Sequence, residues 1–196
     1  VKKNLVLDRS NGMASFNSGI IRFSLPYAFW PKVTKANFSK DHPITNRLES
    51  LVLPWASPIE TVGEQANGVQ VVELARTTPY GWTASSPFNL NPQQRFQVKP
   101  EDRKSRLLAV ALKGKFTSFF KGKGVPPADP PKQGEAAPPD DGDVSVIEES
   151  PETSMLVLGD SDFISDSFLR AFPQNNLFFL NAIDWLAQGE ELIGIR

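Results

Sequence analysis

Residues 155–196, MLVLGDSDFISDSFLRAFPQNNLFFLNAIDWLAQGEELIGIR, say the most about the fold of this chain. Met155 to Leu158 form a short apolar run bounded by Gly159, which is typical of a buried strand. The polar turn Gly159-Asp160-Ser161-Asp162 follows this run and leads into a helix. The segment therefore predicts a strand, an acidic turn and two helices in close succession.

The second helix of this segment has one broad apolar face. Asn175 or Asn176 is placed to cap its first turn. Its apolar residues recur at helical spacing, and its polar residues mark a narrow stripe. The apolar face consists of Phe178, Phe179, Ala182, Ile183 and Leu186, and the polar stripe of Asn181, Asp184 and Gln188. We expect this helix to be mostly buried.

Short apolar runs earlier in the chain predict further strands. They are bounded by turn-forming residues, as strands usually are. The predicted strands are 5–7, 20–25, 51–53, 69–75 and 107–112. Tyr27, Phe29 and Trp30 form an aromatic cluster that we expect to fill a core. Residues 77–92 are rich in Gly, Pro, Ser and Asn and predict a loop with aromatic anchors, a kind of loop that often carries recognition.

Residues 122–152 interrupt this pattern. The segment holds seven prolines, more acidic than basic residues and almost no large apolar side chains. This composition is typical of a disordered or extended linker. Within it, Val144-Ser-Val-Ile147 is apolar enough to add an edge strand. We predict one domain made of residues 1–121 and 153–196, with the Pro-rich acidic segment as a tolerated insertion between two strands.

Composition and charge exclude several classes of function. The formal net charge is -1 and no long Lys/Arg block is present, so we do not expect nucleic-acid binding. The chain has no cysteine, which excludes disulfides, thiolate metal sites and cysteine nucleophiles. It has no glycine-rich phosphate-binding loop, so it is not an ATPase and we expect no cofactor. No segment approaches the roughly 20 apolar residues that span a bilayer.

Gly159-Asp160-Ser161 matches the start of a motif found in one class of serine esterases. A serine nucleophile needs a base within hydrogen-bond reach, usually a histidine held by a carboxylate. The single histidine of the sequence is His42, in a His-Pro-Ile-Thr loop. A serine hydrolase using Ser161 with His42 is therefore an alternative that requires these two side chains to meet.

The acidic turn also contains oxygen ligands of the kind that Ca²⁺ or Mg²⁺ prefers. The spacing of Asp160, Asp162 and Asp166 lacks the alternating Asp/Asn pattern and the closing Glu of a calcium loop. Asp162 and Ser165 are well placed as helix caps, and an acidic residue near a helix start is favoured by the macrodipole. We therefore favour capping and predict no metal site.

Several words of the sequence resemble one known family. They are GDSDF (159–163), FFLNAIDWL (178–186) and the ending EELIGIR (190–196), with weaker matches at 5–8, 27–31, 42–45, 53–57 and 107–120. They resemble the C-terminal signature of the auxiliary, extracytoplasmic proteins of ABC transport systems. This group includes the gliding-motility auxiliary component.

The resemblance implies a fold and a role. Short strands alternating with turn-bounded helices predict an α/β domain with a largely parallel sheet. The family implies that this is a three-layer, flavodoxin-like domain similar to class I glutamine amidotransferases, without their catalytic residues. It also implies an accessory role beside ABC transporter permease and ATPase subunits, at the extracytoplasmic (periplasmic) face of the bacterial inner membrane. Relatives usually carry membrane anchors and further α/β structure upstream of residues 5–8, so we expect this piece to lack the anchors and to be incomplete at its N-terminus.

We expect the contacts of this domain to lie at the acidic turn and at the aromatic loop. Open α/β sheets bind ligands at the C-terminal ends of their strands, where the turn would lie. The predicted contact residues are Asp160, Ser161, Asp162, Tyr80 and Trp82, for a partner subunit or a cell-envelope ligand such as a glycan. The alternatives are the hydrolase and a scaffold that recognises peptide through an edge strand or the Pro-rich insert.

Overall fold

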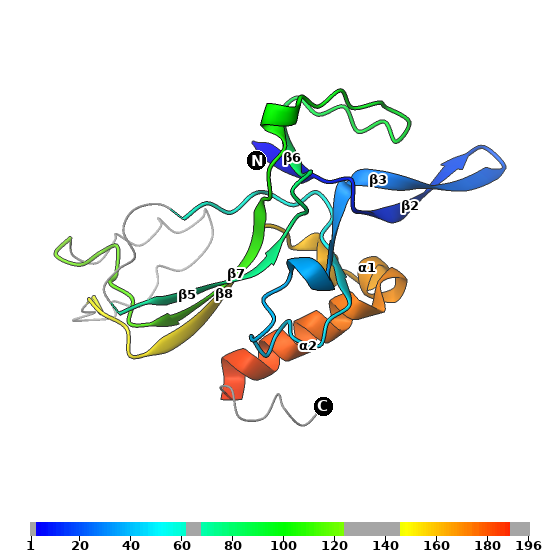
Figure 1. Ribbon diagram of the computed structural model, residues 1–196. Helices are drawn as coiled ribbons and strands as arrows, with labels where there is room; N and C mark the ends of the chain where they lie inside the picture. The colour runs from blue at the N-terminus through cyan, green and yellow to red at the C-terminus, as the bar shows by residue number, and fades with distance from the viewer. Residues whose placement is uncertain (1–2, 62–67, 124–145, 189–196) are drawn as a thin grey trace, which may run out of the picture.

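The structure is a computed structural model that describes residues 3–61, 68–123 and 146–188 (Figure 1). Its eight strands form three small sheets. All strand pairs in the described residues are antiparallel. The first sheet pairs β1 (Asn4–Leu7) with β6 (Trp82–Ser85); the second has the order β2 (Asn11–Ser18), β3 (Ile21–Thr34), β4 (Ser50–Val52); the third has the order β5 (Gln70–Arg76), β7 (Leu107–Gly114), β8 (Thr153–Leu158).

The α-helices of the described residues both follow β8. They are α1 (Asp166–Ala171) and α2 (Pro173–Gln188), and the 3-10 turns are η1 (Lys35–Asn37), η2 (Pro100–Asp102) and η3 (Asp162–Ile164). The predicted succession of strand, acidic turn and two helices is therefore confirmed. Within residues 3–61, 68–123 and 146–188, no helix is long and apolar enough to cross a membrane.

The predicted parallel sheet, and with it the flavodoxin-like or glutamine amidotransferase-like fold, is wrong. Parallel neighbours need a crossover connection, usually a helix, and the described residues between β1 and β8 contain no α-helix. The apolar run of β8 indicated a strand buried on both faces, as in a parallel sheet, but only one face of β8 is buried. Leu156 and Leu158 pack on the core, while Met155 and Val157 are 42% and 36% exposed. Such one-sided burial is typical of antiparallel sheets.

The remaining strand predictions are confirmed in position, with two omissions. The runs at 5–7, 51–53, 69–75 and 107–112 correspond to β1, β4, β5 and β7, and the run at 20–25 begins the much longer β3. Strand β2 was not predicted, because its sequence, NGMASFNS, is largely polar. Strand β6 lies inside the predicted loop 77–92.

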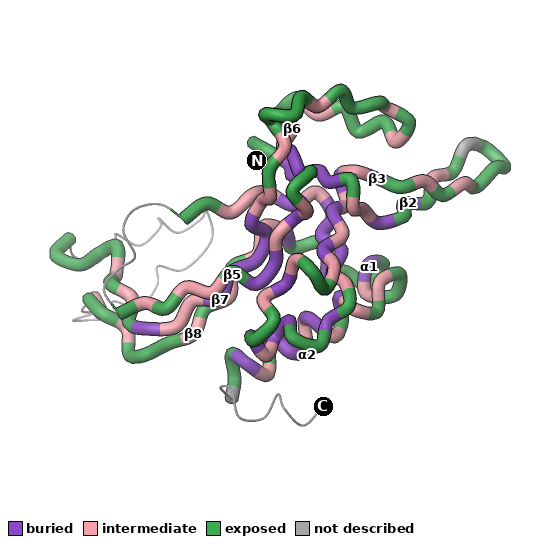
Figure 2. Tube along the Cα trace, viewed as in Figure 1, coloured by how far each residue is buried: buried purple, intermediate pink, exposed green. Residues whose placement is uncertain are grey.

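The main core lies where α2 meets the sheets (Figure 2). Phe178, Ala182 and Trp185 of α2 are buried there, whereas Ile183 and Leu186 of the predicted apolar face are exposed. A second cluster, built around Tyr27, Phe29 and Trp82, contains the predicted aromatic packing and lies between β1, β3 and β6. The buried face of α2 is therefore rotated relative to the prediction.

Two asparagines explain this rotation. Asn175, predicted as a cap, instead lies inside α2, where its Oδ1 accepts a hydrogen bond from Val52 N at 3.0 Å and its Nδ2 donates to Val52 O at 2.8 Å. The amide thus replaces a neighbouring strand at the edge of β4. Asn181, predicted as part of the polar stripe, is buried and donates from Nδ2 to Ile44 O at 3.3 Å. Because backbone groups at the core boundary need partners, α2 turns these amides inward.

Parts of the predicted linker and C-terminus lie outside the described residues. These parts are residues 124–145, which hold most of the Pro-rich segment, and 189–196, which hold the EELIGIR word. Val144 of the predicted edge strand is among them. Where the segment is described, Ser118 N donates to Glu148 O at 2.8 Å and Ser150 N donates to Phe116 O at 2.9 Å. These backbone hydrogen bonds hold the segment that leads into β8 against residues 116–118.

Candidate functional site

The acidic turn after β8 is held by its own carboxylate. The Asp160 side chain is buried and accepts hydrogen bonds from Asp162 N and Phe163 N, each at 3.1 Å. Asp160 therefore caps η3, whereas the predicted cap Asp162 lies inside that turn. The other predicted cap, Ser165, occupies the N-cap position of α1 but its side chain makes no cap hydrogen bond. Ser161 and Asp162 are exposed. Of the three predicted contact residues in this turn, two face the surface and one is structural.

Because Asp160 caps η3 and Asp162 does not, we expect substitutions at these two aspartates to change the free energy of unfolding by different amounts. Replacing Asp160 with Ala removes the acceptor for two backbone donors, so we expect a loss of about 1 kcal/mol of unfolding free energy. Asp162→Ala removes an exposed carboxylate and should change stability by less than about 0.5 kcal/mol. Urea unfolding followed by circular dichroism measures both. Equal losses in the two variants would contradict this assignment.

Ser161 and His42 lie toward opposite ends of α2. The His42 ring packs against Trp185 near the end of the helix, with centroids 5.1 Å apart. Ser161 lies two residues before Phe163, whose carbonyl oxygen accepts a hydrogen bond from Asn175 Nδ2 at 3.3 Å near the helix start. The step from Asn175 to Trp185 spans about 15 Å at about 1.5 Å per residue. This separation gives no support to a hydrolase that uses Ser161 with His42.

The acidic residues near η3 do not converge on one point. In the described part of the chain, no three Asp, Glu or His side chains come together as a metal site. Asp166 forms an exposed ion pair with Arg170, with Oδ2 3.3 Å from Nη2. The alternative of a cation held by Asp160, Asp162 and Asp166 is therefore unsupported.

The second predicted contact region, the loop between β5 and β6, is anchored from below by Asp8. This fully buried carboxylate accepts hydrogen bonds from Thr78 N at 2.7 Å, Thr78 Oγ1 at 2.6 Å and Ser10 N at 3.2 Å. Thr77 fixes the other side of the loop, because its Oγ1 accepts a hydrogen bond from Arg106 N at 2.8 Å. The loop therefore has a defined shape.

This loop places Tyr80 and Trp82 differently. Gly81 passes so close to Thr77 that a Cβ would overlap Thr77 Oγ1 and make a tight contact with the Lys104 carbonyl oxygen. Tyr80 is exposed, and Arg9 lies over its ring with Cζ 5.6 Å from the centroid. Trp82 is largely buried and packs on Phe96, with centroids 5.3 Å apart. No described contact connects either aromatic residue with the acidic turn. The five predicted contact residues therefore belong to two separate regions of the structure.

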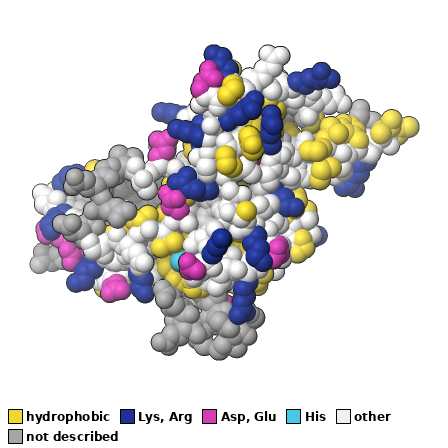
Figure 3. All heavy atoms as spheres, in the orientation of Figure 1, with side chains coloured by type: hydrophobic (Ala, Val, Ile, Leu, Met, Phe, Trp, Pro, Cys, Tyr) yellow, Lys and Arg dark blue, Asp and Glu magenta, His cyan; other side chains and the backbone are white. Residues whose placement is uncertain are grey.

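Trp82 lies in the wall of a surface cleft of about 370 Å³. We call this the Trp82 cleft; its lining residues are Trp82, Thr83, Ala84, Phe96, Gln97, Val98, Asp102 and Arg106. A neighbouring hollow of about 390 Å³ shares Arg106 and also includes Glu73, Arg76 and Lys104. Lys and Arg side chains gather over the part of the surface around β6 (Figure 3). The cleft combines an aromatic wall with a guanidinium, a carboxylate, an amide and a hydroxyl.

Arg106 is the group with the most unused hydrogen-bonding capacity in this cleft. Its Nη2 donates to Asp102 O at a long 3.4 Å, and its Nε is buried and meets no acceptor in the described part of the chain. Buried donors usually have a partner. Because guanidinium groups bind carboxylates and phosphates through paired hydrogen bonds, Arg106 suits an anionic or hydroxyl-rich group.

The neighbouring Arg76 is already neutralised. Its Nε donates to Glu73 Oε2 at 2.6 Å and its Nη2 donates to Glu73 Oε1 at 2.5 Å. This hydrogen bonding lowers the pKa of Glu73 and raises the pKa of Arg76. No ion pair involves Arg106 or Lys104 among the residues that the structure describes. The positive charge available to a ligand therefore comes from Arg106 and Lys104.

Sequence reasoning found Trp82 but missed its partners in the cleft. Phe96 and Asp102 lie in a polar loop without periodicity, so nothing in the local pattern marked them. Arg106 was visible only as the charged residue flanking the predicted strand 107–112. The signal that could have found it is the pairing of Thr77 with Arg106, which depends on the tertiary fold.

The comparisons with known proteins agree with the resemblance in the sequence. A protein of Borreliella burgdorferi, described as uncharacterized, is 23% identical over 197 residues, which cover 98% of this chain and 34% of that protein. This chain thus spans a minor part of that relative's length. No solved structure matches this chain. The family described as ABC-type uncharacterized transport system matches residues 1–187. Because this match covers nearly all of the chain, the chain belongs to that family of ABC-type transport-system proteins.

Proposed function

We propose that this chain is a non-enzymatic, extracytoplasmic domain of an ABC transport auxiliary component, and that it acts by binding at the Trp82 cleft. The occupant is a permease or ATPase-associated subunit of the transporter or a cell-envelope ligand such as a glycan. Family membership supports the transport role. The observation that carries the binding site is the Arg106 guanidinium, whose buried Nε meets no acceptor among the described residues, beside the Trp82–Phe96 pair.

The chemistry of the cleft favours binding over catalysis. Aromatic rings next to a guanidinium, a carboxylate and an amide can hold a hydroxyl-rich or anionic group by stacking and by hydrogen bonds. The side chains considered for nucleophile and base, Ser161 and His42, lie away from each other. A domain with such a cleft is suited to recognising a partner while other subunits hydrolyse ATP and move the substrate.

Affinity purification of the full-length protein from its native membranes tests this proposal. We expect the unaltered bait to recover a permease and its ATPase, and the Phe96→Ala and Arg106→Ala baits to recover about tenfold less, as for a central interface residue. Arg106→Ala keeps the backbone bonds to Thr77, so the loop should stay in place. Lys99→Ala is the matched control, because this exposed cation lies in the same loop and outside the cleft.

Two outcomes would argue against the proposal. Full recovery of the transporter subunits together with unchanged saccharide binding in both cleft variants would move the contact to another surface, and the exposed pair Ser161 and Asp162 would be tested next. If no transporter subunit is recovered with any bait, the transport role itself fails. An envelope-ligand occupant would instead give unchanged subunit recovery together with loss of saccharide binding in Arg106→Ala.

A further inference from the structure

The hairpin formed by β2 and the first half of β3, residues 11–27, projects from the body of the molecule (Figure 1). We call it the hairpin arm. From residue 12 to residue 27 its two strands pair only with each other in the described structure. The base of the arm packs on the second core through Ala14 and Tyr27, with Phe16 against that cluster. The outer part has only its hairpin partner in the described structure, and a two-stranded hairpin is marginally stable alone in water, so this part is expected to have a contact elsewhere.

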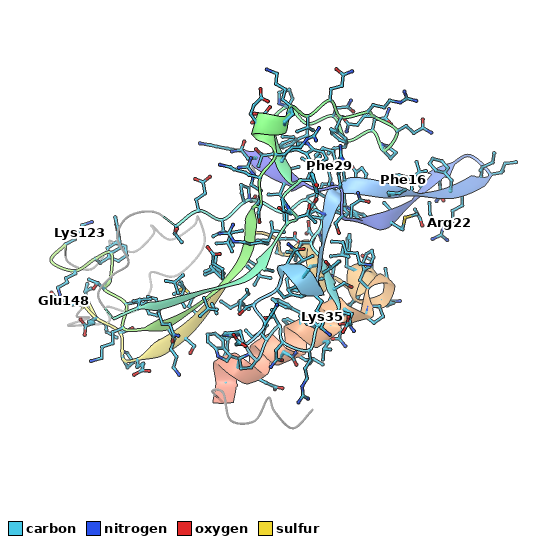
Figure 4. The ribbon with its side chains drawn as sticks, in the orientation of Figure 1. Phe16, Arg22, Phe29, Lys35, Lys123 and Glu148 are labelled. Carbon is cyan, nitrogen blue, oxygen red and sulfur yellow. The ribbon has the colours of Figure 1, made fainter. Side chains whose placement is uncertain are left out.

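The two faces of the arm differ in character. Residues that pair directly across two strands share a face. The pairs Ala14–Leu25 and Phe16–Phe23 form an apolar face, with the Phe rings stacked at 5.9 Å, and the pairs Ser15–Ser24 and Asn17–Arg22 form a polar one. Figure 4 shows Phe16 and Arg22 on the arm, and Figure 3 shows hydrophobic side chains gathered over it. The arm is therefore amphipathic along its length.

The apolar face continues to the tip, where it has no cover. Ile20 is fully exposed, with 104% of the accessible area of a reference isoleucine, and Ile21 is 64% exposed. The turn consists of Gly19, with a φ of 61°, and Ile20. Such two-residue turns favour Gly, Asn or Asp for reasons of backbone geometry. Gly19 meets this requirement, whereas Ile20 does not have a positive φ, so the turn does not constrain residue 20 and its aliphatic side chain stands exposed.

The charge of this region has one sign. Between Asp8 and Asp41 the sequence contains no acidic residue, and its basic residues are Arg9, Arg22, Lys32, Lys35 and Lys40, of which Lys35 forms an ion pair with Glu49. Arg22 is the charged residue of the arm itself and lies two positions from Ile20. In a chain with a formal net charge of -1, this segment is locally positive. An anionic partner surface complements it.

We propose that the hairpin arm is a membrane-contact element that inserts Ile20 and Ile21 into the headgroup region of an anionic bilayer. The exposed apolar tip consists of Ile20 and Ile21, whereas a stable protein interface involves roughly 20–30 residues on each side. A fluid bilayer, in contrast, accepts a narrow wedge without a complementary pocket. The free backbone groups along both edges of the arm limit the insertion to a shallow depth, because they would be unsatisfied in hydrocarbon.

The arrangement of the arm fits this depth. With the isoleucines among the upper acyl chains, the Phe16 and Phe23 rings lie at the interface, where aromatic residues are favoured. Arg22 then lies at the level of the lipid phosphates, and the polar face meets headgroups and water. This inference does not depend on what occupies the Trp82 cleft.

Vesicle co-flotation of this chain tests the inference. We use vesicles of phosphatidylcholine alone and of an equal mixture of phosphatidylcholine and phosphatidylglycerol. We expect stronger binding to the mixed vesicles and weaker binding at high salt, because screening weakens the attraction of Arg22 and its basic neighbours. Ile20→Ser with Ile21→Ser should lower partitioning about tenfold or more. Met13→Ser is the matched control, since Met13 is an exposed apolar residue on the other face of the same arm.

A single Ile20→Asn variant keeps the test valid if the double variant folds poorly, because Asn suits the turn position. It should also bind vesicles more weakly, with an unchanged circular dichroism spectrum. The inference is overturned if the unaltered chain binds neither vesicle, or if Ile20→Asn and the double variant bind as well as Met13→Ser. It is also overturned if sedimentation shows a dimer that Ile20→Asn abolishes, because the tip would then contact a second copy.

Discussion

The Phe178→Ala variant is expected to lose about 3–5 kcal/mol of unfolding free energy. Phe178 is fully buried in the main core, and its ring packs on Phe163, with centroids 5.8 Å apart. Truncation removes a large apolar side chain and leaves a cavity between α2 and η3. The lost transfer free energy and the lost packing add to each other. Urea unfolding monitored by circular dichroism measures the change.

Leu180→Ala is the matched control on the same helix. Leu180 is 40% exposed and lies two residues along α2, on the outer side. Its truncation should change the free energy of unfolding by about 0.5 kcal/mol or less. A loss at position 180 as large as that at position 178 would show that α2 packs with a different face inward.

The Gly159→Ala variant is expected to lose about 3 kcal/mol of unfolding free energy, which is at the upper end of the usual destabilisation by overpacking. Gly159 O accepts a hydrogen bond from Ser57 N at 2.7 Å, and Gly159 N donates to Leu108 O at 3.0 Å. A Cβ at this position would overlap the Ser57 carbonyl oxygen. Because that oxygen belongs to the backbone, the segments around residues 57 and 159 would have to separate to admit the methyl group.

Ser161→Ala provides the comparison for this variant within the same turn. Ser161 is exposed, and its replacement should leave stability within about 0.5 kcal/mol of the unaltered chain. Thermal or urea unfolding of the two variants side by side separates the roles. If Gly159→Ala is as stable as Ser161→Ala, the close approach of residues 57 and 159 is not as described here.

The C-terminal part of the fold could be predicted because its signals are local. The apolar run of β8, the turn at Gly159 and the helical spacing that follows are short-range patterns, and the structure contains the corresponding elements. Strand direction was not predictable in the same way. Whether β8 pairs parallel or antiparallel depends on β7, more than 30 residues earlier, and on what covers each face. The apolar run alone is compatible with both.

The same distinction applies to the candidate site. Trp82 stood out as a large aromatic in a turn-rich loop, and it lies in a cleft. Asp160 stood out as an acidic residue in a turn, but its two hydrogen bonds to backbone donors give it a structural role. Phe96 and Arg106 could not be found, because their importance arises from Trp82 packing on Phe96 and from the hydrogen bond that Arg106 N donates to Thr77 Oγ1. These contacts join segments that are distant in sequence.

The central claim is that this domain is a binding component of an ABC transport system. It is tested most directly by mass spectrometry of the proteins that co-purify with the full-length protein from its native membranes. The account predicts a permease and its ATPase in the unaltered sample, with both depleted in the Arg106→Ala sample and retained in the Lys99→Ala sample. Absence of any transporter subunit from the unaltered sample would contradict it.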